Sequence, residues 1–400
     1  MRVGLVYQTF DLSGSLPRAH VELTRYLVRA GHEVHVFSSA AVTDRSLAPG
    51  AHFHDVATIP AGGRYRAAGN AVAFAWNSTR AVARHRPALD VVHGRGMSTI
   101  HQDIVHLPGV LRGQPEVEPG LTAHERFPFE RRLKELATPL TRPIEPVRNL
   151  LESQVFASPR LSRIHVDSRL VRDDLLEHYS VDEAAVVVVP TGVNLEEFEP
   201  VADRRSLRLE LELPPDETLI LFCGHDFRRK GLDRAILALG AMTERATLVV
   251  IGGRDPSQYE RLAREAGVAE RVLFVGGRTD AARFFQASDI VTLPTRMDMW
   301  GAPVIEAMAS GVPIVTSDAA GASDAVVDGE SGFVLAEPVE PDALAAALDR
   351  LVADPELRAR MGARGLELAR PHSWDGYGAT VEQELLALAE RRGLQRNGSG

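Results

Sequence analysis

Residues 3–38 have the sequence VGLVYQTFDLSGSLPRAHVELTRYLVRAGHEVHVFS, and this stretch decides the fold. Two short runs rich in β-branched residues, Val3–Gln8 and Glu33–Ser38, flank the segment Pro17–Ala30, in which apolar residues recur at helical spacing. Gly31 follows this segment as a helix-ending glycine. A strand, a helix and a second strand in this order predict a parallel βαβ unit.

The same alternation continues along most of the chain and occurs in two halves, so the sequence predicts an α/β fold with two doubly wound parallel sheets. The further strands expected in the first half are Val56–Pro60, Val91–Gly94, Ile104–Leu107, Arg163–Val166 and Ala185–Val189. Those expected in the second half are Thr218–Cys223, Thr247–Ile251, Val272–Val275, Asp289–Leu293, Ile314–Thr316 and Phe333–Leu335. Only helices are expected after residue 341.

The periodicity lapses after Thr191–Asn194, where the acidic, proline-containing segment Leu195–Pro200 follows. We therefore expect a first domain over residues 1–194 and a second over residues 195–372. Residues 373–400 are expected to form a helix that returns to the first domain and ends in a tail, Asn397–Gly400.

Composition restricts the function. The 400 residues contain 45 Lys and Arg against 54 Asp and Glu, with a net charge of −9 and no basic run, so nucleic acid is not an expected partner. The single cysteine, Cys223, excludes a disulfide framework and a multi-thiolate metal site, and it fits a reducing cytosol. No H-E-x-x-H, D-x-D or Cys/His cluster occurs, so no metal site is expected. No basic leader and no apolar run of ~18 residues is present, which favours a cytoplasmic protein.

The most informative stretch for function is Leu293–Gly311. An apolar strand enters a loop containing Asp298, and a helix is expected to begin near Gly301 and Ala302, with Glu306 about one turn inside it. The free N–H groups of such a helix start, at the carboxyl edge of a parallel sheet, suit a phosphate. The alternative is a helix-capping Asp followed by a solvated Glu.

A second strand–loop–helix stretch, Leu221–Asp233, carries three consecutive cations, Arg228, Arg229 and Lys230. Cations at the same sheet edge suit a pyrophosphate and would offset the charge of a departing one. A merely solubilising loop is the alternative. Two phosphate-suited loops in one sheet favour the binding hypothesis.

The first half offers weaker signals. Gly14 lies in a Gly/Ser turn after the first strand, where backbone amides could approach a ligand, but the turn lacks the G-x-G-x-x-G pattern. His93, His101 and His106 lie at or near expected strand ends. Each of the three histidines could equally be a satisfied structural group.

These residues resemble the retaining nucleotide-sugar glycosyltransferases of family 4, which have the two-domain Rossmann-like architecture called GT-B, with a cleft between the domains. The resemblance covers nearly the whole chain. The segment Gly224–Arg234 most resembles the bacterial lipopolysaccharide-core glucosyltransferases. The other matching segments are Ser13–Ser15, Gly31–Val34, Val189–Asn194 and Ser373-Trp374. The pair Asp298 and Glu306, with seven residues between them, also matches.

The resemblance implies a role for each matching residue. Arg229 and Lys230 would bind the donor diphosphate and support the leaving nucleotide, Asp298 would accept from donor-sugar hydroxyls, and Glu306 would accept from the ribose. His106 is our choice for the family's histidine near the reacting carbon, with His101 as the alternative. Backbone contacts to the donor would come from Gly14, Gly301 and Ala302, and the nucleobase would lie near Arg278.

Three departures from the family pattern concern the donor site. Asp298 stands where Glu is usual and is one methylene shorter, and Pro303 removes an N–H that could have contacted phosphate. Ser15 replaces the second glycine of the turn, which raises the steric demand there. The departures leave the choice of donor open.

The implied reaction transfers a hexosyl group from a nucleotide diphosphate sugar, with a UDP-sugar favoured over a GDP-sugar, to an acceptor hydroxyl with retention of configuration. It needs no cofactor and no metal, because cations and a helix start would stabilise the departing diphosphate. We favour a front-face mechanism over double displacement. The acceptor could be a glycan, a lipid-linked sugar or a small molecule. Residues 124–151 mix cations, aromatics and acids, which favours a solvated or interdomain helical segment over a peripheral contact at the inner membrane face.

Two alternatives keep the fold and change the chemistry. One is a sugar-nucleotide epimerase or a phosphorylase. A pyridoxal-dependent phosphorylase would need a Schiff-base lysine, and the only lysines of the chain are Lys134 and Lys230. The other alternative is a nucleotide-sugar binding protein without catalysis.

Overall fold

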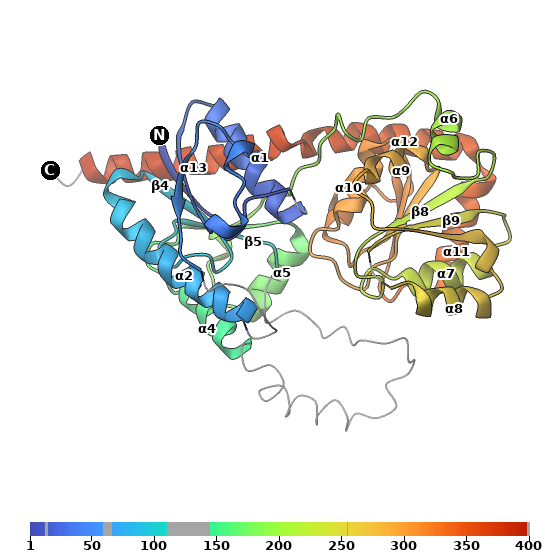
Figure 1. Ribbon diagram of the computed structural model, residues 1–400, viewed down its shortest axis with the longest axis horizontal. Helices are drawn as coiled ribbons and strands as arrows, with labels where there is room; N and C mark the ends of the chain where they lie inside the picture. Colours follow the sequence, from blue (N-terminus) through green and yellow to red (C-terminus); the bar gives the residue numbers. More distant parts are fainter. Residues whose placement is uncertain (13–14, 59–65, 110–144, 254, 398–400) are drawn as a thin grey trace, which may run out of the picture. The chain divides into compact units, whose positions relative to one another are not determined.

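The computed structural model describes residues 1–12, 15–58, 66–109, 145–253 and 255–397 (Figure 1). The chain divides into two compact units. Unit 1 holds the described residues up to Thr191 together with those from Trp374 onward, and unit 2 holds Gly192–Ser373. Each unit contains a sheet in which every described strand pair is parallel, so the predicted fold class is confirmed.

Unit 1 has the strand order β3-β2-β1-β4-β5-β6-β7. Its strands are β1 (Arg2–Val6), β2 (Glu33–Ser38), β3 (His52–Asp55), β4 (Val91–Arg95), β5 (Ile104–Leu107), β6 (Arg163–Val166) and β7 (Val186–Val188). Its described helices are α1 (Ser15–Arg29), α2 (Arg66–His85), α4 (Glu145–Phe156), α5 (Arg169–His178) and α13 (Trp374–Asn397).

Unit 2 repeats this order as β10-β9-β8-β11-β12-β13. Its strands are β8 (Leu219–Cys223), β9 (Thr247–Ile251), β10 (Val272–Gly276), β11 (Ile290–Leu293), β12 (Ile314–Ser317) and β13 (Gly332–Leu335). Its helices are α6 (Arg204–Glu210), α7 (Leu232–Ala241), α8 (Ser257–Glu265), α9 (Ala281–Ala287), α10 (Ala302–Ala309), α11 (Pro341–Ala353) and α12 (Pro355–Ala369).

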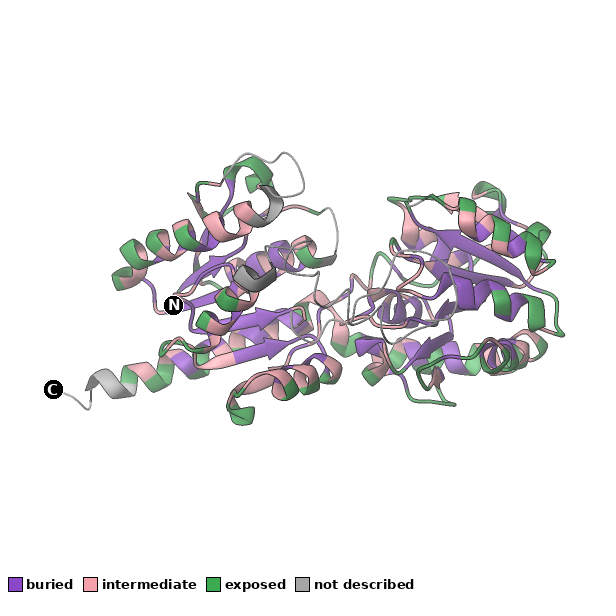
Figure 2. Ribbon diagram, turned by 90° about the horizontal axis from the view of Figure 1, so that it is seen from below, coloured by how far each residue is buried: buried purple, intermediate pink, exposed green. Residues whose placement is uncertain are grey.

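The strands of unit 2 are buried on both faces, as crossover helices require (Figure 2). On one face, Leu221 and Leu293 pack in a cluster with the helices α9 and α10. On the other face, Ile220 and Phe222 pack in a cluster with α7, α8 and α11. Because successive side chains of a strand point to opposite faces, the continuous apolar runs noticed in the sequence supply both cores.

The terminal helix α13 belongs to unit 1, where it packs beside α1. Tyr26 of α1 donates a hydrogen bond to Glu382 of α13 at 2.9 Å, and His32 contacts the same carboxylate at 2.7 Å. Tyr377 and Val381 of α13 are buried in the core of unit 1. The helix predicted to return to the first domain is therefore observed.

One predicted strand was wrong. The sequence favoured Val56–Pro60 because of its β-branched residues, but residues 56–58 are not in a strand, and the strand that pairs with β2 is His52–Asp55. Residues 59 and 60 lie outside the described residues. His54 of this strand stacks on Phe37 of β2, with ring centroids 4.6 Å apart. Phe37 and His54 are opposite each other in this pairing, and a periodicity argument does not detect such contacts across strands.

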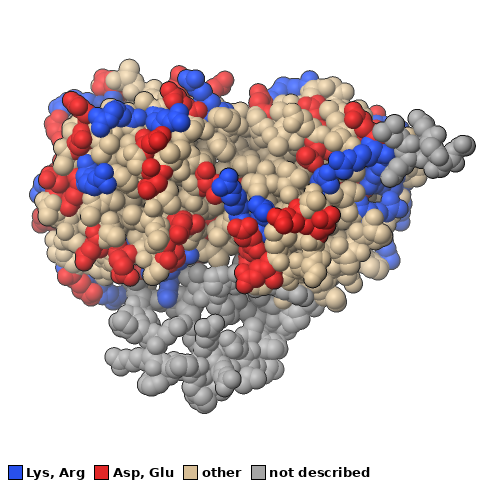
Figure 3. All heavy atoms as spheres, turned by 180° about the vertical axis from the view of Figure 1, so that it is seen from behind, with Lys and Arg blue, Asp and Glu red and all other residues tan. Residues whose placement is uncertain are grey.

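No helix in the described part of the chain has both the length and the apolar character needed to span a membrane. Positive and negative side chains are interspersed over the described part of the face drawn in Figure 3, without a continuous band of Lys and Arg. This distribution agrees with the net charge of −9.

Candidate functional site

The strands β8 and β11 are neighbours at the point where the strand order of unit 2 reverses. In open parallel sheets, ligands bind beyond the carboxyl ends of the strands at such a point. The loop 224–231 follows β8 and the loop 294–301 follows β11, so the two stretches singled out in the sequence meet here. Sheet topology therefore brings together residues that are about seventy positions apart.

Backbone contacts join the two loops. The carbonyl of Arg229 accepts hydrogen bonds from the Arg296 N–H and the Thr295 hydroxyl, both at 2.8 Å. Gly231 has a φ of 79°, and a Cβ built on it would lie 2.1 Å from the Pro294 carbonyl oxygen. Only glycine fits this position, because it tolerates the left-handed conformation and the close approach of the second loop.

Asp298 is the centre of the charged cluster. Lys230 Nζ lies 2.6 Å from Asp298 Oδ2, and Arg229 Nη1 lies 3.4 Å from the same oxygen. Arg229 Nη1 also donates to the Met297 carbonyl at 2.9 Å. Burial raises the pKa of Asp298, but the two adjacent cations outweigh it and hold the pKa below its usual range. The carboxylate is therefore ionised and occupies both cations.

The helix α10 begins where the sequence predicts. Gly301 precedes it with a φ of 83°, Ala302 is its first residue and Pro303 lies in its first turn. The backbone of Asp298 is fixed on the other side, because its N–H donates to the Ala319 carbonyl and its own carbonyl accepts from Gly321, both at 2.8 Å. The start of α10 and the carboxylate of Asp298, which contacts Arg229 and Lys230, thus lie in one loop.

Glu306 lies about one turn inside α10 and is half-buried. The negative charge of Glu306 contributes, after burial, to raising the pKa of the Cys223 thiol to about 12, whereas Lys230 lowers this pKa. Cys223, at the end of β8, therefore lies close to both Glu306 and Lys230 and is protonated. Gly224 makes room for the lysine, since a Cβ there would lie 2.1 Å from Lys230 Cδ.

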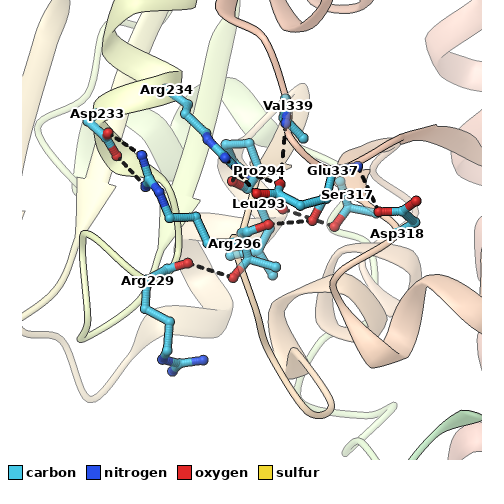
Figure 4. Close-up of polar contacts among 12 residues, drawn as sticks. Arg229, Asp233, Arg234, Leu293, Pro294, Arg296, Ser317, Asp318, Glu337 and Val339 are labelled. Carbon is cyan, nitrogen blue, oxygen red and sulfur yellow. Dashed lines mark hydrogen bonds and ion pairs between the residues drawn. The ribbon is translucent and has the colours of Figure 1, made fainter. Parts of the chain in front are cut away.

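Two bidentate ion pairs, which sequence reasoning missed, support these loops (Figure 4). Arg296 contacts both Asp233 oxygens at 2.9 and 2.6 Å, and it also donates to the Arg228 carbonyl at 2.7 Å. Arg234 contacts both Glu337 oxygens at 2.7 Å and donates to the Pro294 carbonyl at 3.2 Å. The partners are at least 63 residues apart in sequence, so no local spacing signals them.

The structure does not bring Arg278 into this cluster. It lies beyond the edge strand β10, pairs with Asp280 at 2.8 Å and stacks over Phe284. There it lines a cavity of about 610 Å³ together with Phe274 and Val275. Gly14 lies outside the described residues, so the structure does not place it.

The two candidate histidines lie in unit 1. His106 is fully buried, with Nε2 2.7 Å from Asp167 Oδ1 and Nδ1 3.3 Å from the Tyr377 hydroxyl. His101 is half-buried, and burial together with Arg160 and Arg86 lowers its pKa. Sequence reasoning did not detect the Asp167 and Tyr377 contacts, because these residues come from other elements of the fold.

Comparison with known proteins identifies the family. Residues 203–367 match the family described as glycosyl transferases group 1, and residues 18–197 match glycosyltransferase family 4. A D-inositol 3-phosphate glycosyltransferase from Actinosynnema mirum is 31% identical over 94% of this chain and 92% of its own. The chain belongs to the group 1 glycosyltransferases.

Solved glycosyltransferases of low identity share the fold of this group 1 glycosyltransferase. WaaG, a glycosyltransferase involved in lipopolysaccharide biosynthesis, is 20% identical with a TM-score of 0.73, covering 96% of this chain and 99% of its own. HepE from Anabaena in complex with UDP-glucose is 17% identical with a TM-score of 0.68, covering 97% and 100%. The predicted GT-B architecture and the resemblance to this family are confirmed.

Proposed function

We propose that this glycosyltransferase moves a hexosyl group from a nucleotide diphosphate sugar, with a UDP-sugar as the first choice, to an acceptor hydroxyl with retention of configuration. The observation that carries the proposal is the convergence of Arg229 and Lys230 on one carboxylate beside the start of α10. The fold shared with HepE, whose structure holds UDP-glucose, supports the choice of donor.

The donor diphosphate takes the place of the Asp298 carboxylate on the two cations. Arg229 offers a planar fork of N–H donors that suits phosphate oxygens, and Lys230 supplies a compact point charge. The N–H groups at Gly301 and Ala302 add the positive end of the α10 dipole, whereas Pro303 has no N–H to contribute. Asp298, released from the cations, accepts hydrogen bonds from donor-sugar hydroxyls, and Glu306 accepts from the ribose.

The chemical step breaks the bond between the anomeric carbon and the diphosphate oxygen. Negative charge then accumulates on the diphosphate, and Arg229, Lys230 and the α10 start stabilise that charge in place. The acceptor oxygen attacks from the same face, and the departing phosphate oxygen takes its proton, so charge and protons balance. These groups already supply the positive charge that a divalent cation gives elsewhere, and we therefore propose that the step needs no added metal.

His106 remains our prediction for the histidine near the reacting carbon. In the structure its two ring nitrogens face Asp167 and Tyr377, so an approach to the donor requires one of these contacts to exchange. Gly14 remains a predicted backbone contact, and Arg278, paired with Asp280, remains a predicted neighbour of the nucleobase.

The acceptor is proposed by class only: a hydroxyl of a glycan, a lipid-linked sugar or a small molecule. Relatives named for D-inositol 3-phosphate make a phosphorylated polyol the first small molecule to test. A peripheral membrane contact belongs to the lipid-linked case and would show as activity that depends on vesicles.

Thermal shift measurements with a panel of UDP- and GDP-sugars test the proposal, because a ligand that binds the folded state raises its melting temperature by mass action. The best stabiliser is then incubated with each acceptor class, and the anomer of the product is determined by NMR. We expect transfer with retention. Conversion of the nucleotide sugar to its epimer would contradict the proposal. Binding of the nucleotide sugar without transfer to any acceptor would also contradict it.

A further inference from the structure

Three histidines follow one another across the sheet of unit 1. His93 lies on β4, His106 on β5 and His165 on β6, and these strands are neighbours. His106 is in register with His165, and His93 is in register with Ile104, two residues before His106. All three side chains therefore lie on one face of the sheet, the face that packs against α13 through Tyr377.

This cluster is buried and largely unpartnered. His93 is 1% exposed, and His106 and His165 are 0% exposed. Neither ring nitrogen of His93 or of His165 has a hydrogen-bond partner among the described residues. An unpaired buried polar group destabilises the folded state, so a native chain rarely keeps several together unless something binds them.

The geometry suits a transition-metal ion. Each of the three residues offers one ring nitrogen, and these nitrogens all lie within 4.8 Å of one another. The ring centroids are 5.7 to 6.0 Å apart. Zn²⁺ binds imidazole nitrogen at about 2.0–2.1 Å, so the side chains would close on an ion by roughly 1 Å.

The protonation states also suit a metal. Burial lowers the pKa of all three histidines, and their mutual repulsion adds to this effect for His93 and His165. Neutral imidazole is the form that coordinates metal. Three neutral nitrogen ligands from a rigid sheet favour Zn²⁺ or Co²⁺ over Mg²⁺ or Ca²⁺, which prefer oxygen.

A supporting carboxylate is present for one of the ligands. Asp167 Oδ1 lies 2.7 Å from His106 Nε2 and also accepts from the Thr191 hydroxyl at 2.8 Å. Arg95 lies 3.4 Å from the other oxygen of Asp167. A carboxylate that holds the proton on one histidine nitrogen leaves the lone pair on the other, as in carboxylate–histidine–zinc groups.

We propose that His93, His106 and His165 bind one transition-metal ion of the Zn²⁺ class, which ties β4, β5 and β6 together inside unit 1. No metal-binding motif is visible in the sequence, because the ligands come from three strands spread over 73 positions, from 93 to 165. The site does not depend on the proposed function, whose diphosphate chemistry belongs to unit 2. Because Asp167 holds Nε2 of His106, the ion would take Nδ1 in place of the Tyr377 hydroxyl. His106 would then have no nitrogen left for the donor, so this site and the predicted role of His106 near the reacting carbon exclude each other.

The test uses the untagged full-length chain, because a polyhistidine tag would itself bind the probe. Metal content is measured after purification, and the metal-free chain is titrated with Zn²⁺ by calorimetry and with Co²⁺ by visible absorption. We expect one equivalent of each ion, a Co²⁺ band typical of nitrogen ligands, and a higher melting temperature with Zn²⁺.

Three variants sharpen the test. His165→Leu removes a ligand together with two unpaired buried nitrogens, so it should abolish the Co²⁺ band and the stabilisation by Zn²⁺ while leaving the metal-free chain as stable as before. Asp167→Asn should lower Zn²⁺ affinity about 10- to 100-fold. The matched control, His54→Gln, alters a partly buried histidine that pairs with His35 in the same sheet and should leave Zn²⁺ binding unchanged.

The proposal fails if the wild-type chain shows neither the Co²⁺ band nor stabilisation by Zn²⁺, which would assign the unpaired nitrogens to buried water. It also fails if His165→Leu binds Zn²⁺ as tightly as the wild type. If His165→Leu does not fold, the Co²⁺ spectrum of the wild type decides alone. Glycosyl transfer is not a readout of this experiment, so failure of the donor assignment does not affect it.

Discussion

The two units of this glycosyltransferase share one strand order but use its switch point differently. In unit 2, the loops after β8 and β11 present charged groups that are partly open: the Arg229 side chain is 29% exposed, and those of Lys230 and Asp298 are 12% and 13%. In unit 1, the corresponding neighbours β1 and β4 lead to buried groups, among them His93 and Tyr7. The same topology thus serves a partly open ionised cluster in one unit, and in the other it serves buried histidine and tyrosine side chains beside a buried Arg95–Asp167 pair.

The difference shows what topology determines and what side chains determine. The order of the strands fixes where loops gather, but exposure decides whether the groups on them stay charged. Asp298 keeps its charge because Lys230 and Arg229 lie beside it, whereas His20 and His93 have lowered pKa values because burial dominates. A departing diphosphate needs charged groups such as those of unit 2, whereas a metal ion needs neutral imidazoles such as those of unit 1.

The largest expected effect comes from removing the two cations of unit 2. Arg229→Ala together with Lys230→Ala should lower kcat/KM for transfer about 1000-fold or more, because both groups are proposed to stabilise the departing diphosphate. The circular dichroism spectrum should not change. Arg228→Ala is the matched control, since it removes a cation from the same loop without touching the Asp298 pair. Full transfer activity in the double variant would refute the phosphate assignment.

Asp298→Asn separates binding from transfer. Transfer should fall about 100-fold, because a hydrogen-bond acceptor for the donor sugar is weakened. UDP should bind about tenfold more tightly, because the carboxylate no longer competes for Lys230. Kinetics and calorimetry measure the two effects. Weaker UDP binding by this variant would show that Asp298 does not compete with the diphosphate.

The same carboxylate predicts a pH dependence. Since the pKa of Asp298 is lower in the folded state than in the unfolded chain, its pairing contributes stability above the unfolded value. This contribution is lost only as the pH falls through the lowered folded pKa. The acid-induced loss of stability, followed by urea unfolding below pH 5, should therefore be smaller for Asp298→Asn than for the wild type.

Gly231→Ala tests whether the two loops of unit 2 must touch. The added Cβ meets the Pro294 carbonyl, and the residue keeps a positive φ, so the variant should lose about 2 kcal/mol or more of unfolding free energy. Gly267→Ala is the control, with a positive φ but no atom within 4 Å of the Cβ. Equal losses in the two variants would mean that only the backbone angle matters.

A smaller effect is expected at the support of the loops. Arg296→Lys replaces the bidentate ion pair with Asp233 by a single hydrogen bond. The variant should lower kcat/KM about tenfold, mainly by raising KM for the donor. A double-mutant cycle with Asp233→Asn should show that the two changes are not additive. Additive effects would mean that Arg296 does not act through this pair.

The smallest effect lies in unit 1, at the edge of its sheet. Burial and the nearby histidines, His85, His35 and His52, lower the pKa of His54 to about 4, while Asp55 raises it. The unfolded chain therefore binds more protons between about pH 6.5 and 4, so stability falls as the pH decreases through this range. His54→Gln should flatten this slope in thermal unfolding, and an unchanged slope would contradict the assignment.

Much of the fold followed from the sequence because strand and helix periods are local. Strands Ile104–Leu107, Arg163–Val166 and Thr247–Ile251 were predicted with the observed bounds. The start of α10 followed from Gly301 and Pro303, whose backbone preferences are also local. The prediction of Val56–Pro60 failed over residues 56–58, because periodicity does not show which residues pair across strands.

The site could be predicted only in part. The cations and Asp298 were found because each lies in a loop after a strand, and the sheet then joined them. The pairs Arg296–Asp233 and Arg234–Glu337 have no sequence signal, since each is created by loops that meet only in the folded chain. His93 and His106 were noticed near strand ends, but their convergence with His165 was not predicted, because the three residues lie on different strands. For the catalytic and donor-binding roles, the sequence supplies predictions that await the experiments above.

A crystal structure of the chain with bound UDP tests the central claim most directly. The account predicts diphosphate oxygens within hydrogen-bonding distance of the Arg229 guanidinium and the Lys230 ammonium, at the start of α10, with Asp298 released from Lys230. A diphosphate bound away from these two side chains, with the Lys230–Asp298 contact still at 2.6 Å, would contradict it.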